Sequence, residues 1–195
     1  MSKAAATRLG MLQKAFELIY KKGYRATSID EIIATTEVTK GAFFYHFKNK
    51  DEMGLAMIEE VIYPGMYQDL VTPLRVAKDP IEALYTMMQQ VLLQAPFFQI
   101  QHGCPAVNLI EEMAPINASF HQALSKLILQ WQEAIQACIS QGILAGTVSK
   151  EVNPKQVASF IIAGYSGIRN MGKILGPACY QEYLRELKCY LKALT

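Results

Sequence analysis

The sequence predicts an all-α protein in which a small N-terminal domain precedes a larger helical body. Apolar residues recur at spacings of three and four along most of the 195 residues, which is the period of an amphipathic helix. No segment shows the strict alternation typical of a strand, and Gly and Pro separate the helical stretches. Hydrophobic residues make up 51% of the chain, enough to bury a substantial core.

Three short helices are expected early in the chain, over residues 5–22, 28–35 and 39–47. Gly23 stands where a helix C-cap is expected. Thr27 is expected to cap the second helix, with Asp30 three residues later completing a capping box. After a turn at residues 36–38, Thr39 is a good capping residue for the third helix. Two short helices joined by so tight a turn describe a helix-turn-helix.

Prolines mark most helix boundaries in the body. Pro80, Pro154 and Pro177 stand at expected helix starts, where a residue without an N–H is tolerated. Pro64 is expected to kink or end a fourth helix that follows the third. The other expected helices of the body span residues 80–95, 106–113, 117–141 and 154–171, with a last one from Pro177.

Charge is distributed unevenly along the chain. The net charge is only +2, but residues 1–50 hold nine Lys/Arg and four Asp/Glu, which leaves residues 51–195 slightly acidic. A basic head on a mildly acidic body is the charge layout of a nucleic-acid binder. An ordinary solvated face would give the same imbalance, so charge alone does not decide the class.

Composition also disfavours several classes of protein. No run of eighteen apolar residues is present, so no membrane span is predicted. Charged residues interrupt the N-terminal segment, which therefore lacks the apolar stretch of a signal peptide and predicts a cytoplasmic protein. The four cysteines and three histidines show no ligand spacing, so no metal, disulfide framework or cofactor is expected.

The third helix carries the side chains expected to reach DNA. Ile32, Phe43 and Phe47 would lock it against the second helix and leave its small and polar residues facing a major groove. Thr27 and Ser28 stand at a helix N-terminus, where free N–H groups attract phosphate. The candidate contacts on the third helix are Thr39, Lys40, Gly41, Ala42, Phe44, Tyr45 and His46.

The strings TSIDEII (residues 27–33) and VTKGAFFYHFKNKDE (residues 38–52) closely resemble the DNA-binding signature of the TetR family of transcriptional regulators. The resemblance spans residues 8–60 without gaps. Ala42 stands where Thr is usual and Phe44 where Tyr is usual, so fewer polar phosphate contacts are expected there. Apolar contact with a thymine methyl group is a substitute. For the other positions, the resemblance implies base contacts from Thr39, Lys40 and Gly41, and phosphate contacts from Tyr45, His46 and Lys50.

The resemblance also implies a homodimer that binds a palindromic operator and represses transcription. The expected domains are residues 1–50 for DNA binding and residues 51–195 for effector binding and dimerisation. The two heads should read half-sites about 34 Å apart, or a multiple of that distance. Helices 117–141 and 154–171 are the candidates for the dimer face, although packing within one chain explains their small residues equally well.

A small-molecule pocket in the body is a further implication of the resemblance. An unidentified small-molecule or electrophile effector would act by preferring the state that does not bind DNA. Trp131 and Tyr165 are the leading candidates for the pocket lining. The wider set of apolar candidates adds Met87, Met88, Phe97, Phe98 and Met171.

Cys104 is the candidate for sensing through a thiol. It precedes an expected short helix, and a helix N-terminus with a neighbouring base, here His102 or Lys173, lowers a thiol pKa. The Gly-Cys step followed by Asn108 and Glu111 resembles a branch of the same family, some of whose members sense electrophiles or oxidants. Burial as an inert apolar side chain is the alternative.

Two other classes stay open. A thiol-dependent enzyme would use Cys104 with His102 or His121 as base, but no metal motif, phosphate loop or nucleophile elbow is present, so no catalytic residue is assigned. A helical adaptor would bind protein through a head that no longer binds DNA. Salt-dependent affinity for DNA would separate the adaptor from the regulator.

Overall fold

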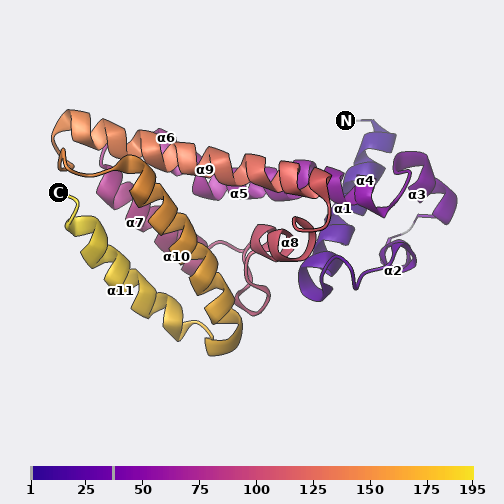
Figure 1. Ribbon diagram of the computed structural model, residues 1–195. Coiled ribbons are helices and arrows are strands. Elements are labelled where there is room, and N and C mark those ends of the chain that lie inside the picture. Colours follow the sequence, from indigo (N-terminus) through magenta and orange to yellow (C-terminus); the bar gives the residue numbers. More distant parts are fainter. Residues whose placement is uncertain (1, 37) are drawn as a thin grey trace. The chain divides into compact units, whose positions relative to one another are not determined.

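The computed structural model describes residues 2–36 and 38–195, and every regular element in them is a helix (Figure 1). The all-α prediction is therefore confirmed. Glu37, in the middle of the expected turn at residues 36–38, lies outside the described residues. The chain divides into two compact units, one made of the residues up to Pro64 together with Pro105–Ser125, the other of Gly65–Cys104 with Lys126–Thr195. The boundary expected at residue 50 stays a prediction.

The first unit contains the helix-turn-helix. Its elements are α1 (Lys3–Lys22), α2 (Ile29–Ala34), α3 (Lys40–His46), α4 (Lys50–Met57), the π-helix η1 (Ile58–Ile62) and α8 (Pro105–Met113). The helix α1 packs against α2, α4 and η1, and α2 packs against α3. Leu12, Ile32, Phe43 and Met53 are fully buried and form the centre of this small core.

Two of the expected caps are confirmed. Gly23 ends α1 with φ of 91°, a conformation that favours glycine, and its N–H donates to the Ile19 carbonyl oxygen at 2.8 Å. Thr39 caps α3, because its hydroxyl accepts the N–H of Ala42 at 3.2 Å.

The capping box of α2 lies one residue later than predicted. Ser28 is the N-cap, and the carboxylate of Glu31 accepts the Ser28 N–H at 2.8 Å in return. The predicted cap, Thr27, is 1% exposed, and its hydroxyl donates to the Gly23 carbonyl oxygen. The predicted partner, Asp30, is shorter than Glu31 by one methylene group, and it is the longer side chain that reaches back across the first turn.

Pro64 does not end the helical path that begins with α4. The π-helix η1 changes the hydrogen-bond register just before it, and α5 (Tyr63–Leu70) follows at once. Pro64 therefore lies within a continuous helical path, directly after a π-helix, where the change of register accommodates its missing N–H.

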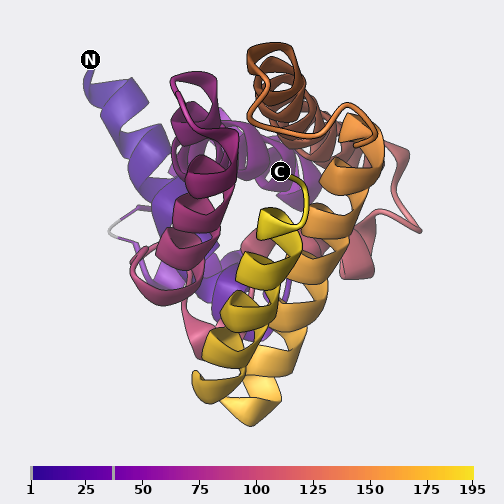
Figure 2. The same cartoon turned by 90° about the vertical axis from the view of Figure 1, so that its left-hand side faces the viewer.

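The second unit is a bundle of longer helices. Besides most of α5, it contains α6 (Thr72–Arg75), α7 (Pro80–Leu93), the 3-10 helix η2 (Ile100–His102), α9 (Ala118–Ala145) from Lys126 on, α10 (Pro154–Leu175) and α11 (Ala178–Lys192). The helix α11 packs against α7 and α10, and Figure 2 shows α10 and α11 side by side. The expected starts at Pro80 and Pro154 are confirmed, with Asp79 and Asn153 as their caps.

Small residues on α10 serve packing within the chain. A Cβ atom at Gly164 would lie 2.4 Å from the Tyr183 hydroxyl, and one at Gly172 would lie 2.4 Å from the Tyr180 hydroxyl. These two glycines therefore admit the tyrosines of α11. Nothing lies within 4 Å of a Cβ placed at Gly167.

Among the residues that the structure describes, no helix is both long enough and apolar enough to span a bilayer.

Candidate functional site

The outer face of α3 exposes two aromatic side chains. Tyr45 is 80% exposed and Phe44 is 45% exposed, whereas Phe43 and Phe47 on the opposite face are buried. Aromatic side chains are enriched at interfaces, so this pair makes the outer face of α3 a candidate binding surface. The arrangement keeps α3 fixed by its inner face and leaves its outer face free for a partner.

Gly41 on this face is not required by the packing of the head. A Cβ atom placed there would meet only the Thr39 hydroxyl, at 3.9 Å, which is ordinary contact. Alanine would be the better helix former at such a position. Packing within the head therefore does not account for glycine at position 41.

Lys40 forms a surface ion pair with Asp30 of α2. The two charged atoms lie 2.9 Å apart, and both side chains are mostly exposed. A pair of this kind contributes about 0–1 kcal/mol. A phosphate or a base edge can therefore take Lys40 from Asp30 at little cost.

Lys50 is turned toward the head itself. Its ammonium group donates to the Tyr24 carbonyl oxygen at 2.5 Å and lies 4.3 Å from the centre of the Tyr24 ring. Burial lowers the pKa of Lys50, while the nearby carboxylates of Glu112 and Asp51 oppose that shift. Lys50, expected to hold a phosphate, thus holds the turn between α1 and α2 in this structure.

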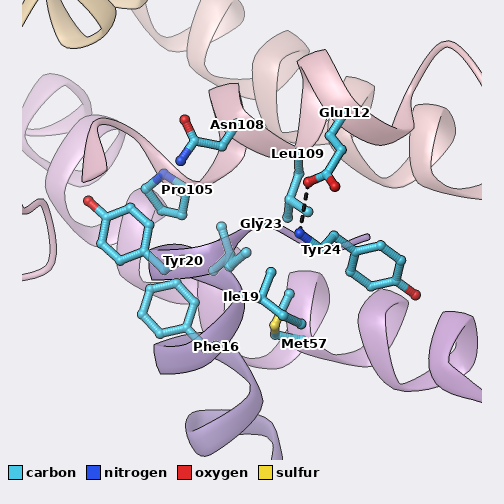
Figure 3. Close-up of a pocket in the computed structure, with 11 residues that line it drawn as sticks. Phe16, Ile19, Tyr20, Gly23, Tyr24, Met57, Pro105, Asn108, Leu109 and Glu112 are labelled. Carbon is cyan, nitrogen blue, oxygen red and sulfur yellow. Dashed lines mark hydrogen bonds between the residues drawn. The ribbon is translucent and has the colours of Figure 1, made fainter. Parts of the chain in front are cut away.

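The carboxylate of Glu112 joins α8 to the same turn. It accepts the backbone N–H of Tyr24 at 2.8 Å and that of Arg25 at 2.6 Å, and Figure 3 shows the first of these bonds. A Cβ atom at Gly23 would lie 3.3 Å from the Glu112 carboxylate, so glycine also leaves room for it. Two successive N–H groups directed at one carboxylate form a strong, charge-assisted contact.

Further polar bonds strengthen this junction. The Tyr24 hydroxyl donates to Asp51 at the start of α4 at 2.7 Å, and the side-chain amide of Asn117 donates to the same carboxylate at 3.1 Å. Burial, with Asp51 beside it, raises the pKa of Tyr24, which keeps the hydroxyl protonated as a donor. The head and α8 are therefore held together by hydrogen bonds as well as by apolar contacts.

A small, mostly apolar pocket lies beside the Glu112 contact within the first unit. Residues of α1, η1 and α8 line it, and Figure 3 shows Phe16, Ile19 and Leu109 among them. Rotation of α8 would have to reshape this pocket, because α8 supplies one of its walls.

The three residues predicted for effector sensing lie together in the core of the second unit. Cys104, Trp131 and Tyr165 are each at most 1% exposed. The rings of Trp131 and Tyr165 meet edge to face with centroids 5.1 Å apart. Burial raises the pKa of Tyr165, and the neighbouring Cys104 raises it further. Met171, predicted to line the same region, is instead 50% exposed, because its side of α10 is uncovered.

Arg169 belongs to this core and escaped the sequence analysis. It is 0% exposed, and its guanidinium carbon lies 4.6 Å from the Phe98 ring centre and 5.7 Å from that of Tyr165. Its Nη1 donates to the Tyr180 hydroxyl at 3.2 Å. Arg169 follows Tyr165 by four residues and therefore shares its helix face, but the sequence does not show which other elements cover that face.

The described residues offer no group of three His, Cys, Asp or Glu side chains that could hold a metal ion. All four cysteines are free, and only Cys189 is exposed.

Comparison with known proteins places both parts of the chain. Residues 11–57 match the family described as bacterial regulatory proteins, tetR family. Residues 80–187 match the tetracyclin repressor-like, C-terminal domain. The chain belongs to the TetR family. Regulators of this family bind operator DNA and act as dimers.

Individual relatives agree with this assignment. The HTH-type transcriptional repressor DhaR from Mycobacterium sp. is 24% identical, over 82% of this chain and 79% of its own. An HTH-type regulator from Lactococcus lactis is 32% identical, over 83% of this chain and 80% of its own. A crystal structure of a TetR regulator from Chloroflexus aurantiacus superposes with a TM-score of 0.87 at 25% identity, covering 97% and 96% of the two chains.

The prediction of a DNA-binding transcriptional regulator is therefore confirmed. The relatives are named as regulators of transcription, and nothing in them favours an adaptor or an enzyme.

Proposed function

We propose that this TetR-family protein is a repressor that binds a palindromic operator as a homodimer and leaves it when an effector acts on the second unit. The outer face of α3 carries the proposal, because it combines exposed aromatic side chains with a glycine that packing does not require. The protein would regulate transcription in the cytoplasm and would have no enzymatic activity.

The proposed contacts follow from side-chain exposure. Tyr45 and Phe44 would lie against the DNA, with Gly41 at the closest approach. Thr39, Lys40, Ala42 and His46 complete the outer face of α3. Ser28 would meet a phosphate at the start of α2. Thr27 is left out because it is buried and its hydroxyl is already bonded.

Lys50 would reach a phosphate only after leaving the Tyr24 carbonyl. Both Lys50 and its neighbour Lys48 add positive potential to this end of the head in either position.

The proposed dimer face is on α10. Phe160 and Met171 are each 50% exposed, Ile174 is 87% exposed, and the open space at Gly167 admits a close neighbour. Helix 117–141, the other candidate from the sequence, stays a prediction for the dimer face, since as α9 it buries Trp131 at 1% exposure but leaves Leu129 53% exposed.

The proposed route from effector to DNA runs through α8. Cys104 is the last residue of its segment of the second unit, and Pro105 begins α8. Glu112, two turns later, holds the turn that leads into α2. A displacement of α8 would thus move the turn from which the helix-turn-helix starts.

Modification of the Cys104 thiol remains part of the proposal as a second route. Its place before α8 would let an adduct displace that helix directly. Full burial restricts access to the thiol, so an electrophile would react only when the core opens. Treating wild-type protein and Cys104→Ser with a thiol-reactive electrophile, then titrating operator DNA, tests this route, since only the wild type should lose affinity.

The decisive experiment is titration of the purified protein with the DNA upstream of its own gene at several salt concentrations. Binding should be sequence-selective and should fall steeply as salt rises. Tyr45→Ala should weaken it by at least about tenfold, the equivalent of about 1.4 kcal/mol. Leu144→Ala is the matched control, because Leu144 is 88% exposed at the far end of α9.

Weak binding without sequence preference, equal in both variants, would contradict the proposed interface. Repression itself is tested separately, because deletion of the gene should raise transcription of the genes it controls.

A further inference from the structure

Five buried polar atoms in the described residues have no hydrogen-bond partner, and all five lie in the second unit. They are Trp131 Nε1, Tyr165 Oη, Arg169 Nε, Arg169 Nη2 and Tyr183 Oη. Native cores leave few such groups, so a cluster of them needs an explanation. Two of the five belong to a single charged side chain, and that side chain carries the inference.

The unpartnered atoms of Arg169 form one edge of its guanidinium group. Nη1 is occupied by the Tyr180 hydroxyl at 3.2 Å, while Nε and Nη2 are both without a partner. In a guanidinium group the N–H bonds of Nε and Nη2 run parallel, and this fork matches the two oxygens of a carboxylate. The edge left open is therefore the one suited to a bidentate anion.

Among the residues that the structure describes, no carboxylate forms an ion pair with Arg169. Aromatic rings flank the guanidinium group, with the centres of Phe98, Tyr165 and Tyr180 at 4.6, 5.7 and 5.8 Å. The ion pairs seen among the described residues involve other cations. Arginine stays protonated in proteins, so the core of the second unit contains a permanent positive charge. A buried charge without a partner is strongly unfavourable, and an anion from outside the chain would relieve it.

We propose that the Nε/Nη2 edge of Arg169 binds the carboxylate of a small organic acid in the core of the second unit. One guanidinium group neutralises one negative charge, and the aromatic walls favour a ligand whose remaining atoms are apolar. Two further polar atoms without hydrogen-bond partners lie nearby. They are the hydroxyl of Tyr165 and the indole nitrogen of Trp131, whose ring packs against that of Tyr165. A charged fork among aromatic rings is the combination by which small-ligand sites fix orientation, and the rings would have to separate to admit a ligand at the fully buried Arg169.

This inference deepens the proposed function by giving the effector a chemical class, and its consequence for DNA binding rests on that function. Cys104 lies beside Tyr165 and directly precedes α8. A ligand that moved Tyr165 would therefore act next to the residue that leads into α8.

Trp131 provides a direct readout, since it is the single tryptophan of the chain and touches Tyr165. We would titrate the full-length protein with formate, acetate, butyrate and benzoate, each beside its amide, and with inorganic phosphate, while following tryptophan fluorescence. The acids should give a saturable change and the amides none, because an amide lacks the charge. Equal binding of acid and amide, no binding of any acid, or saturation by phosphate alone would overturn the proposal.

Arg169→Lys keeps the charge but removes the fork. It should weaken acid binding by at least about tenfold, the equivalent of about 1.4 kcal/mol. Arg185→Lys, the same change at an exposed position of α11, should bind as the wild type does. Unchanged binding in Arg169→Lys would overturn the proposal. If that variant does not fold, the comparison of acid with amide on the wild type decides alone.

Operator titrations keep the two proposals distinguishable. Acid binding without any effect on DNA affinity would leave the site standing and remove its role as the effector site. DNA binding in a protein that binds no acid would leave the repressor standing and remove the site.

Discussion

In the first unit the Glu112 carboxylate accepts two backbone N–H groups of the turn after α1, whereas in the second unit the Arg169 guanidinium keeps two nitrogens, Nε and Nη2, without a partner. The first arrangement satisfies its polar groups within the chain and therefore holds two elements together. The second leaves them available and therefore costs stability unless something else binds. Polar groups of one protein are thus satisfied within the chain in one region and left without partners in another.

The largest expected effect comes from removing the unpaired charge. Arg169→Met should raise the free energy of unfolding by about 1–4 kcal/mol, as replacement of buried charges by apolar side chains of similar volume often does. Urea denaturation of the ligand-free protein measures it. Arg185→Met on the surface should change stability by at most about 0.5 kcal/mol.

A loss of stability in Arg169→Met would break the comparison. It would mean that the ring contacts and the Tyr180 bond already compensate the buried charge.

Glu112→Gln tests the paired side of the comparison. An amide offers one acceptor oxygen where the carboxylate offers two, so the free energy of unfolding should fall by about 1–3 kcal/mol. Hydrogen exchange at the Tyr24 and Arg25 amides should accelerate at the same time. Glu59→Gln is the control, since Glu59 is an exposed carboxylate of the same unit. An equal loss in both variants would show that general charge, and not this contact, supports the junction.

Gly41→Ala separates stability from recognition within the first unit. Replacing glycine in a helix should add about 0.5–1 kcal/mol to the free energy of unfolding. The added methyl group should nonetheless weaken operator binding, by about tenfold if one contact worth about 1.4 kcal/mol is lost. Gly10→Ala in α1, which also has open space around it, should give the stability gain with unchanged DNA affinity. Unaltered binding by Gly41→Ala would remove Gly41 from the interface.

The smallest effect concerns the exposed capping box of α2. The Lys22 ammonium and then the Ser28 N–H and hydroxyl lower the pKa of Glu31 from 4.5 to about 2. A lowered pKa means that this contact stabilises the fold above about pH 4.5 and is lost as the pH falls toward about 2. Melting temperatures across that range should fall slightly less for Glu31→Gln than for the wild type. Parallel curves for the two proteins would show that Glu31 titrates alike in the folded and unfolded chain.

Sequence reasoning succeeded where the structure is decided by near neighbours. The caps at Gly23 and Thr39 and the helix start at Pro154 depend on residues within one turn, so they can be predicted from local spacing. The shift from Thr27 to Ser28 shows the limit of that method, because two hydroxyl residues in succession offer the same local signal.

The contacts that sequence reasoning missed join distant segments. The Glu112 carboxylate accepts a backbone N–H from a turn 88 residues earlier in the chain. In the sequence, the neighbouring carboxylate at position 111 gives no indication of that contact. Arg169 lies in an apolar helix, but the rings that enclose it come from other segments. Phe98 precedes η2 and Tyr180 belongs to α11. No local pattern reports which charged residue of a helix will be enclosed by other elements.

The first unit is discontinuous along the chain, and this has a consequence for recombination. A chimera that joins the head of this protein to the body of another regulator at residue 64 would leave Pro105–Ser125 behind. The transplanted head would then lack the Glu112 carboxylate and one wall of its own core. Exchange of DNA specificity between such proteins should therefore succeed when α8 and the first turns of α9 are transferred together with the head. A chimera made by joining two genes at a single point should instead lose the stability of its head.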